Sequence, residues 1–128
     1  MTIDGILDTT IVIDMLRSTP VALNWHRGLG QKVVAITPIV WMETVQGARD
    51  KTERSQIVRF VRQYPVEHPN ADDNRWAMRQ FAQFHLSHGI EMADVLIASV
   101  AVRSNVPLYT LNLKHYQILP GVDVRRPY

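Results

Sequence analysis

The sequence has 128 residues, the length of a single domain, and can bury about two-thirds of the surface that its unfolded chain would expose. Hydrophobic residues make up 46% of it and charged residues 20%, so the chain is expected to fold, and the lack of cysteine excludes disulfides, thiolate nucleophiles and cysteine-bound metal sites. The formal net charge of +2 permits contact with a polyanion without requiring it.

The N-terminal segment carries no recognisable targeting signal. The residues MTIDGILD lack a basic start and a long apolar stretch, and the longest apolar run, near ADVLIASVAV, is too short to span a bilayer. We therefore expect a cytoplasmic protein that does not cross a membrane.

Short β-like runs alternate with longer helical ones along the chain. In the first half we expect strands over 4–7, which ends at Asp8, and 32–36, and helices over 9–17, 20–29 and 37–49, the last with Thr37 as its N-cap. In the second half we expect helices over 51–64, 70–88 and 92–104, extended chain over 65–68, strands over 106–111 and 121–127, and a helical turn over 113–119. This alternation, with no linker or repeat, predicts one α/β domain over 1–128 whose parallel sheet is covered by helices on both faces.

Four oxygen-bearing side chains, from four separate segments, are expected to lie at one edge of that sheet. They are Asp8 after the first strand, Glu43 in the helix after the second, Asp94 at the head of the apolar helix, and Asn112 after the third strand. Ligands of parallel sheets gather beyond the carboxyl ends of the strands. The sequence therefore places a candidate site there before any motif is named.

Each of these residues also has a purely structural interpretation. Asp8 and Asp94 could cap helices, and Asn112 could be a turn residue. Glu43 is harder to explain in this way, because it lies inside a helix among apolar neighbours and Arg49, the nearest cation, is six residues away. Acids without cationic partners favour a site for a hard divalent ion such as Mg²⁺ or Mn²⁺, and metal-assisted hydrolysis of a phosphodiester as the reaction class.

The order ILDTTIVIDMLR, TPIVWMETVQGAR and MADVLIASVAVRSNVPLYTLNLKHYQILPGVDVRRP resembles the PIN-domain ribonucleases, specifically the VapC toxins of toxin–antitoxin modules. The most specific part is the C-terminal third, with an Asp that opens an apolar helix, a Thr-x-Asn step and a Lys-His-aromatic turn. The resemblance implies a three-layer α/β/α sandwich with a central parallel sheet, a Mg²⁺ or Mn²⁺ cofactor, and cleavage of RNA, often tRNA or ribosomal RNA. It also implies a small antitoxin as partner, whose C-terminal segment occupies the active-site groove, and a homodimer.

Matched to the family, the three acids that bind metal fall on Asp8, Glu43 and Asp94, and a fourth catalytic position, often Asp, falls on Asn112. Asn at this position lowers the negative charge of the site. Thr9 and Thr110 match small hydroxyl residues that lie near the acids, and the resemblance implies that they support them.

Two other functions stay open at this stage. A degenerate PIN fold would bind RNA or a partner without cutting it. A phosphatase of the haloacid dehalogenase type would use an aspartyl nucleophile after the first strand, but it would need a second Asp where Thr10 stands, and it gives no role to Glu43.

The remaining charged residues receive other interpretations. Asp4, Asp14 and Glu91 do not match the site, and His85 and His88 are expected to be exposed helix residues rather than metal ligands. Between Arg49 and Arg62 five basic residues outnumber two acidic ones, which fits either a solvated helix face or an RNA-binding patch.

Overall fold

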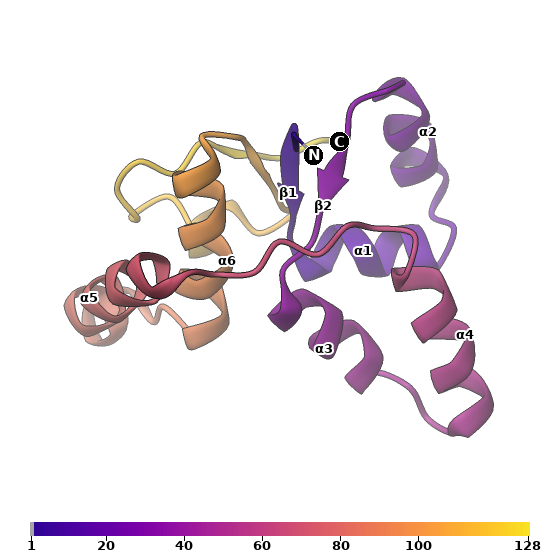
Figure 1. Cartoon of the computed structure of the whole chain (residues 1–128), viewed down its shortest axis with the longest axis horizontal. Coiled ribbons are helices and arrows are strands. Elements are labelled where there is room, and N and C mark those ends of the chain that lie inside the picture. The colour runs from indigo at the N-terminus through magenta and orange to yellow at the C-terminus, as the bar shows by residue number, and fades with distance from the viewer. Residues whose placement is uncertain (1) are drawn as a thin grey trace.

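A parallel sheet of four short strands forms the centre of the computed structural model, which describes residues 2–128 (Figure 1). The strands are β1 (Gly5–Leu7), β2 (Val34–Ala35), β3 (Leu108–Tyr109) and β4 (Val124–Arg125), and their order in the sheet is β2-β1-β3-β4. Every pairing is parallel, with Ile6 opposite Ala35 on one side and opposite Leu108 on the other. The carboxyl ends of all four strands therefore lie at the same edge of the sheet.

Helices cover the sheet from two sides, as the alternation of strands and helices predicted. In Figure 1, α5 and α6 lie on one side of β1 and β2, and the first four helices lie on the other. Within residues 2–128 the α-helices are α1 (Thr9–Leu16), α2 (Pro20–Gly28), α3 (Pro38–Gln46), α4 (Lys51–Val61), α5 (Ala71–His88) and α6 (Met92–Ser104). A short 3₁₀ helix, η1 (Leu113–His115), follows β3.

The core is built from the apolar faces of these layers. Ile6 and Leu7 of β1 and Leu108 of β3 are fully buried, as are Ile11 and Val12 of α1 on one side. On the other side α6 is buried along much of its length, which explains its apolar sequence. This packing holds the end of β1 and the starts of α1 and α6 in a defined arrangement.

The strands are shorter than the sequence predicted. The extended runs 32–36, 106–111 and 121–127 each pair over only two residues. Single hydrogen bonds continue the ladder beyond them, from the Asp4 N–H to the Val33 carbonyl at 2.7 Å and from the Thr110 N–H to the Arg125 carbonyl at 3.0 Å. The expected extended piece at 65–68 contributes one parallel bridge, between Ile36 and Val66.

Most helix ends follow the signals in the sequence. Asp50 caps α4 by accepting the Glu53 N–H at 2.8 Å, and Gly89 ends α5 with a left-handed backbone (φ +64°), which glycine adopts at little cost. Thr37 takes the predicted N-cap position of α3, but its hydroxyl makes no cap bond and, among the described residues, is buried without a partner. The position was predicted correctly and the capping bond was not.

Candidate active site

Asp8 is a buried carboxylate at the carboxyl end of β1, where it is only 7% exposed. It occupies the N-cap position of α1, but its side chain makes no capping bond. Within residues 2–128 none of the ion pairs includes Asp8. Because an isolated buried carboxylate costs several kcal/mol, its other contacts must account for its position.

Hydroxyl groups surround this carboxylate. Thr110 donates to Asp8 Oδ2 at 2.7 Å and Thr10 donates to the same oxygen at 3.0 Å. The Tyr116 phenol, from the turn after η1, donates to Oδ1 at 2.9 Å. Hydroxyl donors favour the charged form of a carboxylate and fix its orientation, but they add no positive charge.

Glu43 projects from the middle of α3 and is half-buried. The Thr9 hydroxyl donates to its Oε1 at 2.7 Å, so a hydroxyl of α1 also holds the second acid. Glu43 makes no ion pair within residues 2–128. It lines a hollow of about 330 Å³ between α1, α3 and α4, to which Arg17 and Glu53 also contribute.

Asp94 lies in the first turn of α6 and is 6% exposed. Its Oδ2 accepts the Glu91 N–H at 3.1 Å, so the expected capping role is present, and the same oxygen lies 3.4 Å from His115 Nδ1. Burial raises the pKa of Asp94, although the bond from Glu91 and the nearby imidazole of His115 oppose this. The protein therefore holds this group at some electrostatic cost in its charged form.

Tyr116 connects the three acids. Its side chain is fully buried, and burial raises the pKa of its phenol well above the ordinary value. The negative charges of Asp8, Asp94 and Glu43 each raise it further, in that order. Of the three carboxylates, Asp8 bonds to this hydroxyl directly, and Asp94 and Glu43 act on it only through their charge.

Asn112 stands slightly apart from this group. Its backbone N–H donates to Thr110 Oγ1 at 2.9 Å, and that hydroxyl in turn donates to Asp8. Asn112 also lines a separate hollow of about 380 Å³ together with Lys114 and Arg126. The structure links Asn112 to the acids through Thr110 rather than through its own side chain.

The chemistry of these residues fits a hard divalent ion. They offer carboxylate oxygens at a strand edge, and Asp8 and Glu43 have hydroxyl donors but no cationic partner within residues 2–128. Over the same residues, no three acid or histidine side chains already stand at the mutual spacing of a bound ion. Each acid is oriented by hydrogen bonds of its own.

The other acids and histidines have separate structural roles. Asp4 accepts the Val33 N–H at 2.8 Å, and Asp14 accepts the hydroxyl of Tyr128 at 2.8 Å. Glu91 is an exposed N-cap residue. His85 and His88 are exposed on α5, where the first stacks on Phe81 and the second contacts Ser87.

The sequence analysis gave no individual role to Thr10, His115 or Tyr116. Thr10 was considered only as a missing aspartate, although a hydroxyl two residues after Asp8 was a usable signal. His115 and Tyr116 were part of the Lys-His-aromatic turn on which the family resemblance depended. Their contacts with Asp94 and Asp8 could not be predicted, because they span 21 residues or more along the chain and depend on how η1 packs.

Comparison with known proteins adds a family to this geometry. The profile of the PIN domain family matches residues 5–118. Ribonuclease VapC19 of Mycobacterium tuberculosis is 30% identical over 127 residues, which cover 96% of this chain and 98% of the relative.

Solved structures match over nearly the whole chain. The structure of VapBC2 from Rickettsia felis, bound to a DNA fragment from its promoter, gives a TM-score of 0.81 at 21% identity and covers 96% of this chain and 98% of that chain. DNA-bound VapBC from Salmonella typhimurium gives 0.83 at 16% identity and covers 99% and 100% of the two chains. The likeness at these identities is one of fold, and it confirms the predicted α/β/α architecture around a parallel sheet.

Proposed function

The chain belongs to the PIN domain family, and from this premise we propose that it is a divalent-metal-dependent endoribonuclease that acts as the toxin of a toxin–antitoxin pair. The observation that carries the proposal is Asp8. This carboxylate is buried at the end of β1, is held by the hydroxyls of three residues, and has no cation beside it within residues 2–128.

The chain's own residues prepare the site before an ion arrives. Asp8, Glu43 and Asp94 would hold a Mg²⁺ or Mn²⁺ ion, and each already accepts hydrogen bonds that limit its rotation. The ion would supply the positive charge that the site lacks and would activate water for attack on a phosphodiester. Thr9 and Thr110 orient Glu43 and Asp8, and Thr110 also connects Asn112 to the group.

A cleavage assay with labelled RNA tests the proposal. We expect cleavage with Mg²⁺ or Mn²⁺, none in EDTA, and loss of cleavage in Asp8→Asn, Glu43→Gln and Asp94→Asn. Asp14→Asn is the matched control, because Asp14 bonds to Tyr128 rather than to the site. Cleavage that persists in EDTA, or that survives in all three site variants, would contradict the proposal.

The two other functions give different results in the same assay. A PIN fold that only binds would retain RNA but leave it intact in Mn²⁺. A phosphatase would release phosphate from small monoesters and ignore RNA. The target RNA, for which the resemblance implies tRNA or ribosomal RNA, would follow from mapping the cleaved ends in total RNA.

The hollow beside Glu43 fits the expected antitoxin partner. It lies between α1, α3 and α4 and combines the apolar Ile13 and Leu16 with the carboxylate of Glu43; Arg17 also lines it, and its second acid, Glu53, is already paired with Arg49. An antitoxin segment with an apolar side chain and an Arg would find complementary groups there, and it would shield Glu43 from RNA. We expect Glu43→Gln to weaken antitoxin binding as well as cleavage.

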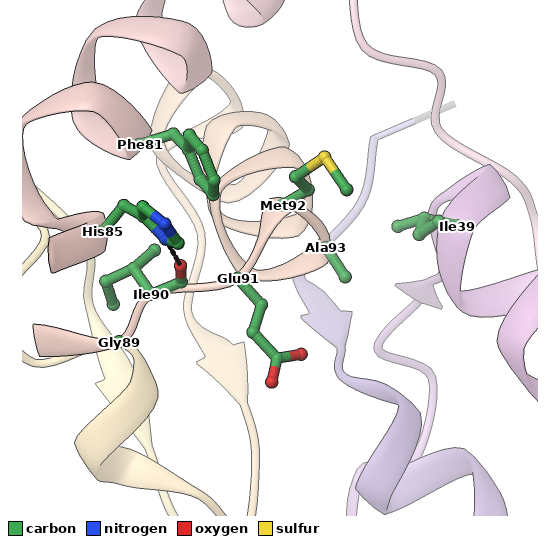
Figure 2. A pocket seen from close by; sticks show the side chains of 8 residues that line it. All are labelled: Ile39, Phe81, His85, Gly89, Ile90, Glu91, Met92 and Ala93. Atoms are coloured by element: carbon green, nitrogen blue, oxygen red, sulfur yellow. Dashed lines mark hydrogen bonds between the residues drawn. The ribbon is translucent and has the colours of Figure 1, made fainter.

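A second hollow supports the homodimer. It has a volume of about 460 Å³ and lies where α3 faces the junction of α5 and α6, lined by apolar side chains that include Ile39, Phe81 and Met92 (Figure 2). Met92 is 70% exposed, and so is Met78 one turn before Phe81. Exposed apolar surface of this kind typically marks an interface. Met92→Glu should therefore shift the protein toward the monomer in analytical ultracentrifugation.

A further inference from the structure

The outward face of α4 carries a line of positive charge. Lys51, Arg54, Arg59 and Arg62, here called the basic stripe, recur at three-, five- and three-residue intervals and share one face of the helix with Ser55 and Val58. Ile57 and Val61, which turn toward the core, are buried, whereas all four members of the stripe are exposed. Figure 1 shows α4 at the periphery of the molecule, beside α3.

The stripe has no acidic partner among residues 2–128. The arginines in ion pairs there are Arg49, Arg75, Arg103 and Arg125. Arg49, at the start of the same helix, is neutralised by Glu53 at 2.9 Å. Asp50 lies one turn before Arg54, but it caps the helix and pairs with no arginine. Like charges three residues apart on a helix cost a few tenths of a kcal/mol. Arg59 and Arg62, at the C-terminal end of α4, gain from the helix dipole, whereas Lys51 and Arg54 near its start do not.

The arginines of the stripe also frame a concave surface. Arg54, Arg59 and Arg62 line a hollow of about 360 Å³ together with Ser55 and Val58. Guanidinium groups bind phosphate through paired N–H donors and are weakly hydrated, which makes an unpaired arginine cluster a phosphate site. The hydroxyl of Ser55 donates to the Lys51 carbonyl at 3.1 Å, so the arginines supply the free donors.

The stripe has the length and the position to contact a nucleic acid strand near the acids. From Lys51 to Arg62 a helix rises about 16 Å, enough to reach several consecutive phosphates of one strand. Another face of α4, through Glu53, Gln56 and Ile57, lines the hollow that contains Glu43. Because a helix with its side chains is about 10–12 Å across, a strand held on the stripe needs only a few nucleotides to reach that hollow.

We propose that the basic stripe of α4 binds the phosphates of single-stranded RNA and positions it for cleavage beside Glu43. This inference rests on the proposed function, because it takes RNA as the substrate. The stripe contacts the phosphate charges of the RNA and not its bases, so it supplies affinity and orientation without sequence specificity. It also gives α4 two roles, since one face borders the acidic hollow and another guides the substrate toward it.

The experiment compares two triple variants with the same change in net charge. R54Q/R59Q/R62Q removes the arginines of the stripe, and R75Q/R79Q/R125Q removes three exposed arginines on α5 and β4. Binding of a fluorescent single-stranded RNA is measured by anisotropy in EDTA between 50 and 200 mM salt. Circular dichroism confirms that both variants fold.

We expect the stripe variant to bind RNA less tightly and with a weaker salt dependence. Each lost phosphate contact should reduce the slope of log K against log[salt] by about 0.7, so the triple variant should lose about 2 in slope. The ratio of the RNA affinity of the parent to that of the stripe variant should then fall about 20-fold between 50 and 200 mM salt. In each single Arg→Gln variant the slope should fall by about 0.7. These variants replace the triple variant in the experiment if it misfolds.

Several results would overturn the inference, and they separate it from the proposed function. If the parent binds and cleaves RNA but the stripe variant binds with an unchanged slope, the stripe is not the RNA surface and the nuclease proposal stands. An equal loss in the control variant would mean that net charge alone matters. Unchanged RNA binding with loss of a co-expressed antitoxin would assign the stripe to a protein partner. A parent that neither binds nor cleaves RNA would contradict both proposals.

Discussion

Two buried aspartates, one at the carboxyl edge of the sheet and one on a helix that covers it, show how burial can serve stability or function. Asp73 of α5 is 4% exposed and bonds to Arg103 of α6 at 2.7 Å and to the Asn70 N–H at 3.0 Å. Asp8 is 7% exposed, and within residues 2–128 its side chain bonds only to hydroxyls. Over these residues Asp73 has a counter-charge beside it, whereas Asp8 does not.

A buried charge indicates a function when the fold supplies no counter-charge for it. Asp73 joins the start of α5 to the end of α6, and Arg103 also reaches the His68 carbonyl at 3.2 Å, so this region is electrostatically complete. At Asp8 the protein provides orientation without positive charge. A charge that the fold leaves uncompensated requires a partner from outside, and a divalent ion fits the oxygen ligands present.

The largest expected effect is on RNA cleavage, which should depend on Asp8 but not on Asp73. Asp8→Asn keeps the shape of the side chain but removes its charge, and we expect RNA cleavage at saturating Mn²⁺ to fall by roughly 10³-fold, since several kcal/mol of transition-state stabilisation depend on the ion. Asp73→Asn should leave the turnover of the folded enzyme within about twofold. Equal losses in both variants would remove the functional distinction.

Tyr116→Phe sharpens the comparison by removing one of the hydroxyls on Asp8 while keeping the buried ring. Because a hydrogen bond to a charged group is worth about 1.5–3 kcal/mol, the free energy of unfolding by urea in EDTA should fall by about that amount. Tyr64→Phe is the matched control, because the Tyr64 hydroxyl is buried without a partner among the described residues. This control should be as stable as the parent or more stable, and equal losses in the two variants would contradict the assigned role of Tyr116.

Asp73→Asn tests the contact between α5 and α6 through its effect on the free energy of unfolding. The variant breaks the pair with Arg103, whose side chain is 36% exposed and can be solvated, so we expect a loss of about 1–3 kcal/mol rather than the full cost of a deeply buried pair. Asp72→Asn removes the neighbouring exposed pair with Arg75 and should change stability by less than about 0.5 kcal/mol. Urea unfolding monitored by circular dichroism measures both. A negligible effect of Asp73→Asn would mean that its pairing adds nothing to the fold.

The smallest expected effect concerns Asp94 and its pH dependence. Burial raises the pKa of Asp94, so the folded protein binds this proton more tightly than the unfolded chain and loses stability as the pH rises through and above the ordinary aspartate range. Asp94→Asn removes this loss, so in EDTA its melting temperature should exceed that of the parent slightly at pH 7. The difference in melting temperature between the variant and the parent should shrink as the pH is lowered to where the Asp94 carboxyl is protonated in both the folded and the unfolded chain. A lower melting temperature at pH 7 would show that the bond to the Glu91 N–H outweighs the cost of the buried charge.

More of the architecture than of the contacts within the site could be predicted from the sequence. The alternation of apolar runs predicted the helices and the parallel sheet, because hydrophobic periodicity is local. It overestimated the strand at 32–36, since strand length depends on a partner that is only three residues long in β1. It also predicted a capping bond from Thr37 that the packed chain does not make.

Asp8 and Asp94 could be singled out because one follows a strand and the other begins a helix, and Glu43 because it is a charge among apolar neighbours, all of which is visible in the sequence. Of their supporting groups, Thr9 and Thr110 were indicated by the family resemblance alone, and Tyr116 was not predicted, because it comes from a distant segment. The Thr110 and Tyr116 hydroxyls reach Asp8 across more than 100 residues, so only the folded sheet brings them together. Asp73 appeared as one helix residue among many, and its pairing with Arg103 depends on how α5 packs against α6.

Calorimetric titration of Mn²⁺ into the RNA-free protein tests most directly whether an ion completes the site at Asp8. The account predicts saturable binding to the parent and to Asp73→Asn, and its loss or marked weakening in Asp8→Asn. Undiminished binding in Asp8→Asn, or no binding to the parent at millimolar Mn²⁺, would contradict it.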